Sequence, residues 1–331
     1  MAIIKNKTTE KIHTLMNAPT LYSIEDSVSD KMICNYKDLD SKMVAIENGF
    51  VGSISDCFIL YAIGILRYAS KESILLFLNN LSKKEPGYYI PELDNEGLTN
   101  RIKVLSKYGF IVRVDSEVTV ENLSNSHLIL YVVTEDGRTL ANNRLQKRMK
   151  PDRFGTTRPL AEKVGMGAAA CLAVRLMDSP YFIDYSDGIF KGNYCGTVKL
   201  DIELCFKKDD MPIRVAILSF FAHQNKGYMN EKALKDYKYH KLNIMRDFIV
   251  AKTREGERKG YVICVCENQK EFDEAVEFLI NSNGFDDEQL PLIYFTTHSV
   301  ITGVKDMKNA FLQISQDNNG EIVYSNGCDF L

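Results

Sequence analysis

Residues 95–114 read NEGLTNRIKVLSKYGFIVRV, and this stretch decides the fold of the first half of the chain. Leu98, Ile102 and Leu105 recur at i, i+4 and i+7, which places them on one face of a helix running from Asn95 to Tyr108. Gly109 predicts the end of that helix, because glycine adopts the left-handed conformation at little cost. The alternation that begins at Phe110 then predicts a strand directly after the helix.

The segments around this helix and strand complete a recognisable order of elements. The sequence predicts a buried helix at 54–69, a support helix at 71–84 followed by the turn Glu85-Pro86-Gly87, a polar tip at 115–127, a return strand at 128–133, and a closing helix after Thr134-Glu135-Asp136-Gly137-Arg138. Three helices followed by two strands with a polar tip is the order of a winged helix. Winged helices mostly bind duplex DNA, so double-stranded DNA is the expected partner.

The length of 331 residues exceeds what one winged helix needs and predicts further domains. We expect an N-terminal helical arm at 1–52, with a helix from about Tyr22 or Asp30 to Asn48. A winged-helix DNA-binding domain at 53–150 and an α/β domain at 151–331 should follow. The predicted fold class is therefore α+β.

The second half alternates strand and helix signals. Expected elements are a helix at 160–177, strands at 181–184, 197–206 and 213–221, a long polar helix at 230–252, a strand at 260–266, a helix at 269–282, a strand at 292–296 and a helix near 305–310. This ending predicts a mixed sheet with at least one parallel pair. A hairpin after a helix, then a helix and a further strand, is also the order found in restriction-endonuclease-like nucleases.

Composition excludes several classes of function. No run of 18 apolar residues exists and the first residues lack the apolar core of a secretion signal, so we expect a cytoplasmic protein without membrane contact. The 8 cysteines form no C-x-x-C pair and the 5 histidines show no zinc spacing, so no metal and no cofactor are expected. The net charge of −3 means that DNA contact must come from a local basic patch.

Two segments could supply that patch. On the predicted helix the outward side chains are Asn95, Thr99, Asn100, Lys103 and Lys107, with Arg101 near the boundary and Arg113 on the following strand. Asn, Arg and Lys match base edges in the major groove, and Thr and Lys suit phosphate contacts. A basic connector from Arg138 to Lys163 adds Arg138, Arg144, Lys147, Arg148, Lys150 and Arg153. The alternatives are an ordinary solvated helix and a flexible linker, and the acids of the polar tip argue against a DNA-gripping wing.

A nuclease site is the third candidate. Asp184, Asp201 and Glu203 could hold Mg²⁺, but the next strand, 214–221, contains neither the acid nor the lysine that such enzymes need. The pattern is incomplete, so we expect the second domain to be catalytically silent. Magnesium enters only if the nuclease alternative holds.

The chain resembles the replication-relaxation family of plasmid and mobile-element proteins. The residues that carry the resemblance are Asn95–Val114, Tyr131–Gly137, the strand–hairpin–helix order of Tyr181–Lys252 and the strand ending Tyr294–Thr297, so that it covers about Ser53 to Leu312. The resemblance implies DNA binding in plasmid replication or mobilisation. The Lys-, Asn- and Ile-rich composition without Trp is typical of a low-GC bacterium or its plasmid.

The sequence therefore predicts a sequence-specific binder of double-stranded DNA, acting as an initiator or accessory factor of plasmid replication. A homodimer and contacts with replication or mobilisation proteins are further expected partners. A winged-helix transcriptional repressor, a metal-dependent endonuclease or nickase, and a protein-interaction scaffold without DNA affinity remain the alternatives.

Overall fold

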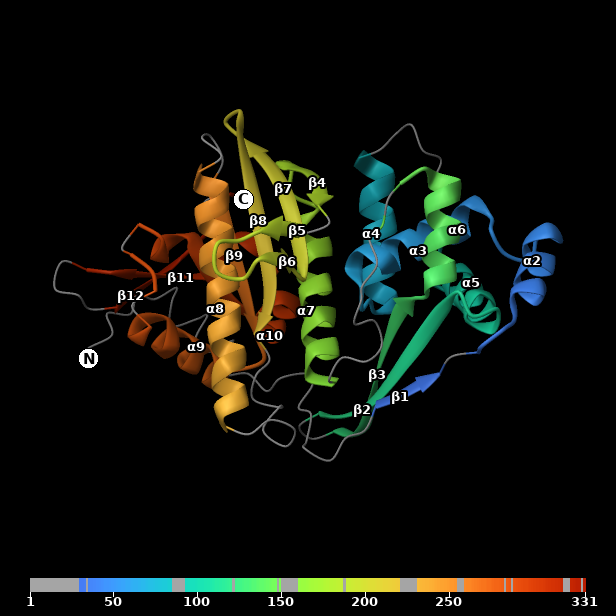
Figure 1. The fold of residues 1–331 in the computed structure, drawn as a ribbon, viewed down its shortest axis with the longest axis horizontal. Helices are drawn as coiled ribbons and strands as arrows, with labels where there is room; N and C mark the ends of the chain where they lie inside the picture. Colours follow the sequence, from blue (N-terminus) through green and yellow to red (C-terminus); the bar gives the residue numbers. More distant parts are fainter. Residues whose placement is uncertain are drawn as a thin grey trace. The chain divides into compact units, whose positions relative to one another are not determined.

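The structure is a computed structural model of the chain (Figure 1), which describes residues 30–33, 35–84, 93–120, 123–147, 149, 160–186, 189–220, 231–254, 259–282, 284–286, 288–317, 322–328 and 330–331. The chain forms two compact units. The described residues of the N-terminal unit lie within 27–118 and 125–178, and those of the C-terminal unit lie within 119–124 and 179–331. Both contain helices and strands, which confirms the α+β class in its coarse form.

The unit boundary differs from the expected one at 151. Helix α7 (Leu160–Leu176) belongs to the N-terminal unit, where the Asn80 side chain of α4 (Lys71–Lys84) donates a hydrogen bond of 2.8 Å to the Val174 carbonyl. Gly167 of α7 lies against Leu130 in the same unit. Gly167 thus permits α7 to pack closely within the N-terminal unit.

The described part of the expected arm, residues 30–33 and 35–52, belongs to the N-terminal unit. Residues 30–33 form strand β1 (Asp30–Ile33), and the helix α2 (Leu39–Glu47) is shorter than predicted; Tyr22 lies outside the described residues. Strand β1 pairs antiparallel with β2 (Ile111–Val120), which is followed by β3 (Leu123–Val133), giving the order β1-β2-β3. This part of the arm is therefore integrated into the unit through β1.

The core of the N-terminal unit is helix α3 (Ile54–Leu66), which is apolar nearly all round and packs on α4 and α6 (Glu135–Leu145). Its first turn is closed by a capping box, in which the Asp56 amide donates to the Ser53 hydroxyl at 3.2 Å. Between α3 and α4, Ala69 forms an isolated bridge with Tyr131 of β3. The polar tip expected at 115–127 is mostly strand, because β2 and β3 extend through it, and the Pro86-Gly87 turn lies outside the described residues.

The C-terminal unit is built on a seven-stranded mixed sheet of order β12-β11-β10-β9-β8-β7-β4. Its strands are β4 (Phe182–Ser186), β7 (Ile202–Lys208), β8 (Met211–Phe220), β9 (Lys259–Cys266), β10 (Ile293–Thr297), β11 (Leu312–Gln316) and β12 (Ile322–Asn326). Strands β4, β7 and β8 are antiparallel neighbours, whereas β8, β9 and β10 run parallel. The turn between β7 and β8 uses Asp209 and Asp210 at φ 51° and 64°, as a two-residue hairpin turn requires.

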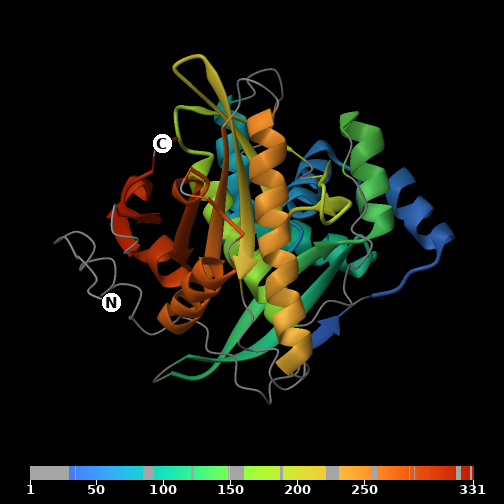
Figure 2. The ribbon, with the colours of Figure 1, turned by 60° about the vertical axis from the view of Figure 1, so that its left-hand side comes forward.

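Helices cover this sheet between its parallel strands. Helix α8 (Glu231–Arg254) lies along β8 and β9, and α9 (Gln269–Asn281) contacts β9 and β10 (Figure 2). The helix expected near 305–310 is a single 3-10 turn, Met307–Asn309, preceded by the short α10 (His298–Gly303) and the 3-10 turn Leu290–Leu292. Strands β11 and β12 were not predicted. None of the described helices combines the length and apolar character needed to cross a bilayer.

A small hairpin, β5 (Ile189–Lys191) and β6 (Thr197–Lys199), replaces the first part of the strand expected at 197–206. Its loop is fixed to α8 by the buried Asp247, whose Oδ2 accepts from the Tyr194 and Cys195 amides at 2.8 and 2.9 Å. A Cβ on Gly192 would lie 2.2 Å from the same oxygen, so only glycine fits there.

Candidate nucleic-acid interface

Helix α5 (Asn95–Lys107) forms where the apolar spacing predicts it. The Asp94 carboxylate caps its first turn by accepting from the Gly97 amide at 2.6 Å. Leu98, Ile102 and Leu105 are buried, and Gly109 follows at φ 74°. The chain then passes into β2, so that one face of α5 is held by the core and the other faces outward.

The outward face carries most of the predicted polar side chains. Asn95, Asn100, Lys103 and Lys107 are exposed. Thr99 is half-buried, and its hydroxyl is engaged: it donates to the Asn95 carbonyl at 2.6 Å and accepts from Lys71 Nζ at 3.3 Å. The structure therefore brings Asn100, Lys103 and Lys107 together as an exposed polar set on one helix.

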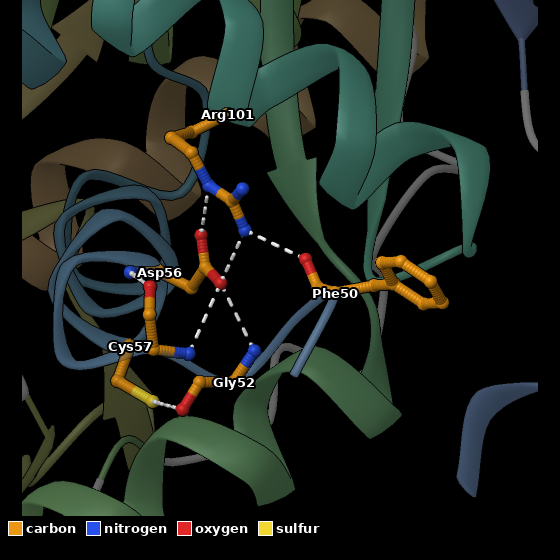
Figure 3. Close-up of polar contacts among 6 residues, drawn as sticks. Phe50, Gly52, Asp56, Cys57 and Arg101 are labelled. Carbon is orange, nitrogen blue, oxygen red and sulfur yellow. Dashed lines mark hydrogen bonds and ion pairs between the residues drawn. The ribbon is translucent and has the colours of Figure 1, made fainter. Parts of the chain in front are cut away.

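Arg101 has a different role from the one expected. Its guanidinium forms a bidentate ion pair with the buried Asp56 of α3: Nε donates to Oδ1 at 2.8 Å and Nη2 donates to Oδ2 at 2.7 Å (Figure 3). Nη2 also donates to the Phe50 carbonyl at 2.9 Å. Nε and Nη2 of Arg101 thus hold α5 against α3, which favours a positioning role for Arg101 over the expected contact with DNA.

The Asp56 carboxylate is fully supplied with donors. Besides Arg101, Oδ2 accepts from the Gly52 and Ser53 amides at 2.9 and 3.1 Å. The hydrogen bond to Asp56 raises the pKa of Arg101, which keeps the guanidinium charged. Burial, with the Asp56 charge nearby, raises the pKa of the neighbouring Cys57 thiol to about 11, so this cysteine is a packed and unreactive group.

The predicted contact on the hairpin is also partnered. Arg113 of β2 forms an ion pair with Asp115 at 2.7 Å, and its side chain is partly exposed. Asp115, one of the acids of the polar tip, thus neutralises the charge of Arg113. Arg113 can reach a phosphate only by exchanging this partner.

The two ends of the basic connector belong to different helices, since Arg138 and Arg144 lie in α6 and Lys163 lies in α7. Arg138 is mostly buried and pairs with Glu135 at 3.3 Å, Arg144 is exposed, and Lys147 Nζ lies 5.2 Å from the centre of the Tyr61 ring. Arg148, Lys150 and Arg153 lie outside the described residues. Of the described connector residues, Arg144 is the one placed for contact with a ligand in solvent.

The motif Thr134-Glu135-Asp136-Gly137 has a structural explanation. The Thr134 hydroxyl caps α6 by accepting from the Gly137 amide at 3.2 Å, and it contacts the Phe110 carbonyl at 3.0 Å. A Cβ on Gly137 would lie 2.2 Å from that same carbonyl oxygen. The motif therefore joins the start of α6 to the start of β2, and it carries packing rather than chemistry.

The three carboxylates of the nuclease alternative lie on neighbouring strands. Asp184 is exposed on β4, Glu203 is buried on β7 and pairs with Arg214 at 3.8 Å, and Asp201 precedes β7. Asp201 Oδ2 accepts from the Ser219 amide and hydroxyl at 2.9 and 3.0 Å.

Lys241 of α8 completes the surroundings of Asp201, with Nζ 3.6 Å from Oδ2. The sequence does not reveal this contact, because Lys241 belongs to a lysine-rich stretch that is typical of a solvated helix face. Over the described residues, no three His, Cys, Asp or Glu side chains gather to hold a metal ion.

Comparison with protein-family models, with curated proteins and with solved structures finds no match to this chain.

Proposed function

We propose that this chain binds double-stranded DNA in a sequence-specific manner through the exposed face of α5. The observation that carries the proposal is the arrangement of that helix. Arg101 locks α5 to the core through Asp56, while Asn100, Lys103 and Lys107 remain exposed on its outer side. A rigid helix that presents an amide and two ammonium groups can read base edges and contact phosphates in one groove.

The order of elements in the N-terminal unit supports a winged helix. Helix α3, the bridge at Ala69, helices α4 and α5, and strands β2 and β3 follow one another as in that fold. In a winged helix the third of these helices is the one that enters the major groove. Helix α5 holds this place.

The C-terminal unit supports a nuclease-like fold that serves as a scaffold. Three antiparallel neighbours (β4, β7 and β8) are followed by α8 and by β9, which runs parallel to β8. Asp201 is bound by Ser219 and lies beside Lys241, while Glu203 pairs with Arg214. Carboxylates with such partners favour a structural role over metal-dependent cleavage.

The proposed setting is plasmid replication, with the chain as initiator or accessory factor, as the family resemblance implies. A transcriptional repressor would use the same face of α5. DNA footprinting on the replicon and on its promoters separates the two, because protection of an origin repeat supports replication and protection limited to a promoter supports repression.

The direct test is fluorescence anisotropy of labelled replicon DNA with the full chain. Asn100→Ala should weaken binding about tenfold on the cognate site, since a bidentate amide–adenine contact contributes about 1–3 kcal/mol. Lys103→Ala should weaken binding to all sequences and reduce the salt slope by about one. Lys83→Ala is the matched control, because Lys83 is an exposed lysine of α4 paired with Asp178.

Unchanged affinity in both α5 variants would contradict the recognition role of this helix.

The nuclease alternative has its own assay. Magnesium-dependent nicking of plasmid DNA that disappears in Asp201→Ala would revive it, and intact plasmid in the presence of every divalent metal would close it.

A further inference from the structure

Helix α2 exposes apolar side chains and buries a lysine. The side chains that it buries are Lys42 and Ala45, whereas Leu39, Met43 and Val44 are exposed beside the acidic Asp40 and Glu47. A surface helix of a globular protein normally buries its apolar stripe and exposes its charges. The exposed apolar side chains, with a charge buried behind them, suit a face that another surface covers.

The buried side fixes α2 in this orientation. Lys42 Nζ forms an ion pair with Asp136 of α6, and it lies 6.0 Å from the centre of the Phe110 ring. The Lys42 side chain is only 9% exposed. Rotating α2 to hide its apolar residues would break the ion pair of Lys42 with the half-exposed Asp136 and bring Lys42 into solvent, so the exposed face is a stable feature of the fold.

Phe50 extends the apolar face beyond the helix. Its amide donates to the Ala45 carbonyl at 2.9 Å, and its own carbonyl accepts from Arg101 Nη2. Both bonds hold the backbone, and the ring points away from the Arg101–Asp56 pair (Figure 3). Phe50 is thus presented as an exposed aromatic side chain on a fixed backbone, and aromatic side chains often form the centre of protein interfaces.

We propose that the α2 patch, defined as Tyr36, Leu39, Met43, Val44 and Phe50, is the interface through which two copies of this chain form a two-fold symmetric dimer. These side chains are 46% to 88% exposed. With roughly 200 Å² for a large apolar side chain, the patch offers about 600 Å² per copy. A standard interface covers about 800 Å² per partner, so the patch and a polar rim suffice for a stable dimer.

The charges around the patch fit a second copy. Lys37 lies at the start of α2 and Glu47 is its last residue, and both are exposed. In a two-fold pair of antiparallel α2 helices, Lys37 of each copy faces Glu47 of the other. Such a pairing is self-complementary, as an isologous interface requires, and it also aligns the two helix dipoles favourably.

Sedimentation velocity of the full chain, without DNA, tests the dimer independently of the proposed function. The wild type should sediment as a dimer at micromolar concentration, and Leu39→Glu combined with Met43→Glu should sediment as a monomer with an unchanged melting temperature. Leu76→Glu is the matched control, because Leu76 is an exposed leucine of α4 outside the patch, and it should remain dimeric. A monomeric wild type at 100 µM, or a double variant that stays dimeric, overturns the proposal.

Charge reversal tests the antiparallel arrangement. Lys37→Glu and Glu47→Lys should each weaken the dimer about fivefold, because each creates two like-charge contacts across the axis. The two reversals combined should restore the wild-type dissociation constant. Additive weakening in the combined variant would show that Lys37 and Glu47 do not face each other and would overturn the antiparallel dimer.

Discussion

Arg101 of α5 and Asp56 of α3 form a two-pronged ion pair, with one nitrogen of the guanidinium on each carboxylate oxygen at 2.8 and 2.7 Å. Asp56 is completely buried, whereas the Arg101 side chain is 30% exposed. The same carboxylate caps the first turn of α3, so one side chain both starts the central helix and positions the helix proposed to read DNA. Mutation of Asp56 alone therefore cannot separate these two functions.

The unequal burial of this pair predicts unequal costs of mutation. Arg101→Met should lower the free energy of unfolding by about 3 kcal/mol, because it leaves a buried carboxylate without its counter-charge. Asp56→Asn should cost less, about 1–3 kcal/mol, because the remaining guanidinium can turn to water. Urea titration of the two variants measures the difference.

Arg101→Lys serves as the control for this pair. An ammonium group restores the charge but not the two parallel hydrogen bonds, so its stability should lie between those of the wild type and Arg101→Met. If Arg101→Met proves as stable as the wild type, the pair contributes nothing to holding α5.

Gly137→Ala should destabilise the N-terminal unit by about 1–3 kcal/mol. The added methyl group would lie 2.2 Å from the Phe110 carbonyl oxygen, and a backbone atom cannot move aside as a side chain can. Gly303→Ala at the end of α10 is the comparison, since a Cβ there meets nothing within 4 Å. Thermal unfolding should leave Gly303→Ala unchanged; equal losses in both variants would show that the close approach at Gly137 is not the cause.

His298 should make the C-terminal unit sensitive to acid. Burial lowers the pKa of this imidazole to about 4, below its ordinary value of 6.5. Between these two values the unfolded chain binds more protons than the folded chain, so stability is full above pH 6.5 and falls as the pH drops towards 4. The loss attributable to His298 is at most about 3 kcal/mol, from about 1.4 kcal/mol per pH unit.

The measurement is the pH dependence of unfolding in wild type and His298→Gln. Glutamine cannot take up the proton, so the slope between pH 6.5 and 4 should flatten in the variant. A slope that is identical in the two proteins would assign the acid sensitivity to other groups.

Asp247→Ala should release the β5–β6 hairpin. The variant removes the acceptor of the Tyr194 and Cys195 amides, and a two-stranded hairpin is marginal on its own. Hydrogen exchange at these two amides should become faster, while exchange in β8 and β9 stays slow. Uniform acceleration across the unit would indicate global destabilisation instead of a local anchor.

Local patterns sufficed for much of the fold. The apolar spacing of 71–84 and 95–107 predicted α4 and α5 almost to the residue. One face of each helix is buried, so its apolar residues recur every three or four positions. The alternation in β11 and β12 is of the same kind, since the first and third residues of each strand are buried, but each strand has only five residues.

Long-range relations were not accessible in this way. Arg101 lies 45 residues from Asp56, and nothing in the local sequence distinguishes an arginine that binds a buried acid from one that awaits a phosphate. Likewise the small residues of α7 allow close packing but do not identify the partner, so the expected boundary at 151 differs from the division into compact units. The DNA-contacting role of Asn100, Lys103 and Lys107 stays a prediction.

The contact between Lys241 and Asp201 has a consequence for the mechanics of the C-terminal unit. Asp201 stands just before β7 and also accepts a hydrogen bond from Ser219 of β8, so one carboxylate connects two strands to helix α8. A displacement of α8 along the sheet would therefore pull on both strands at once.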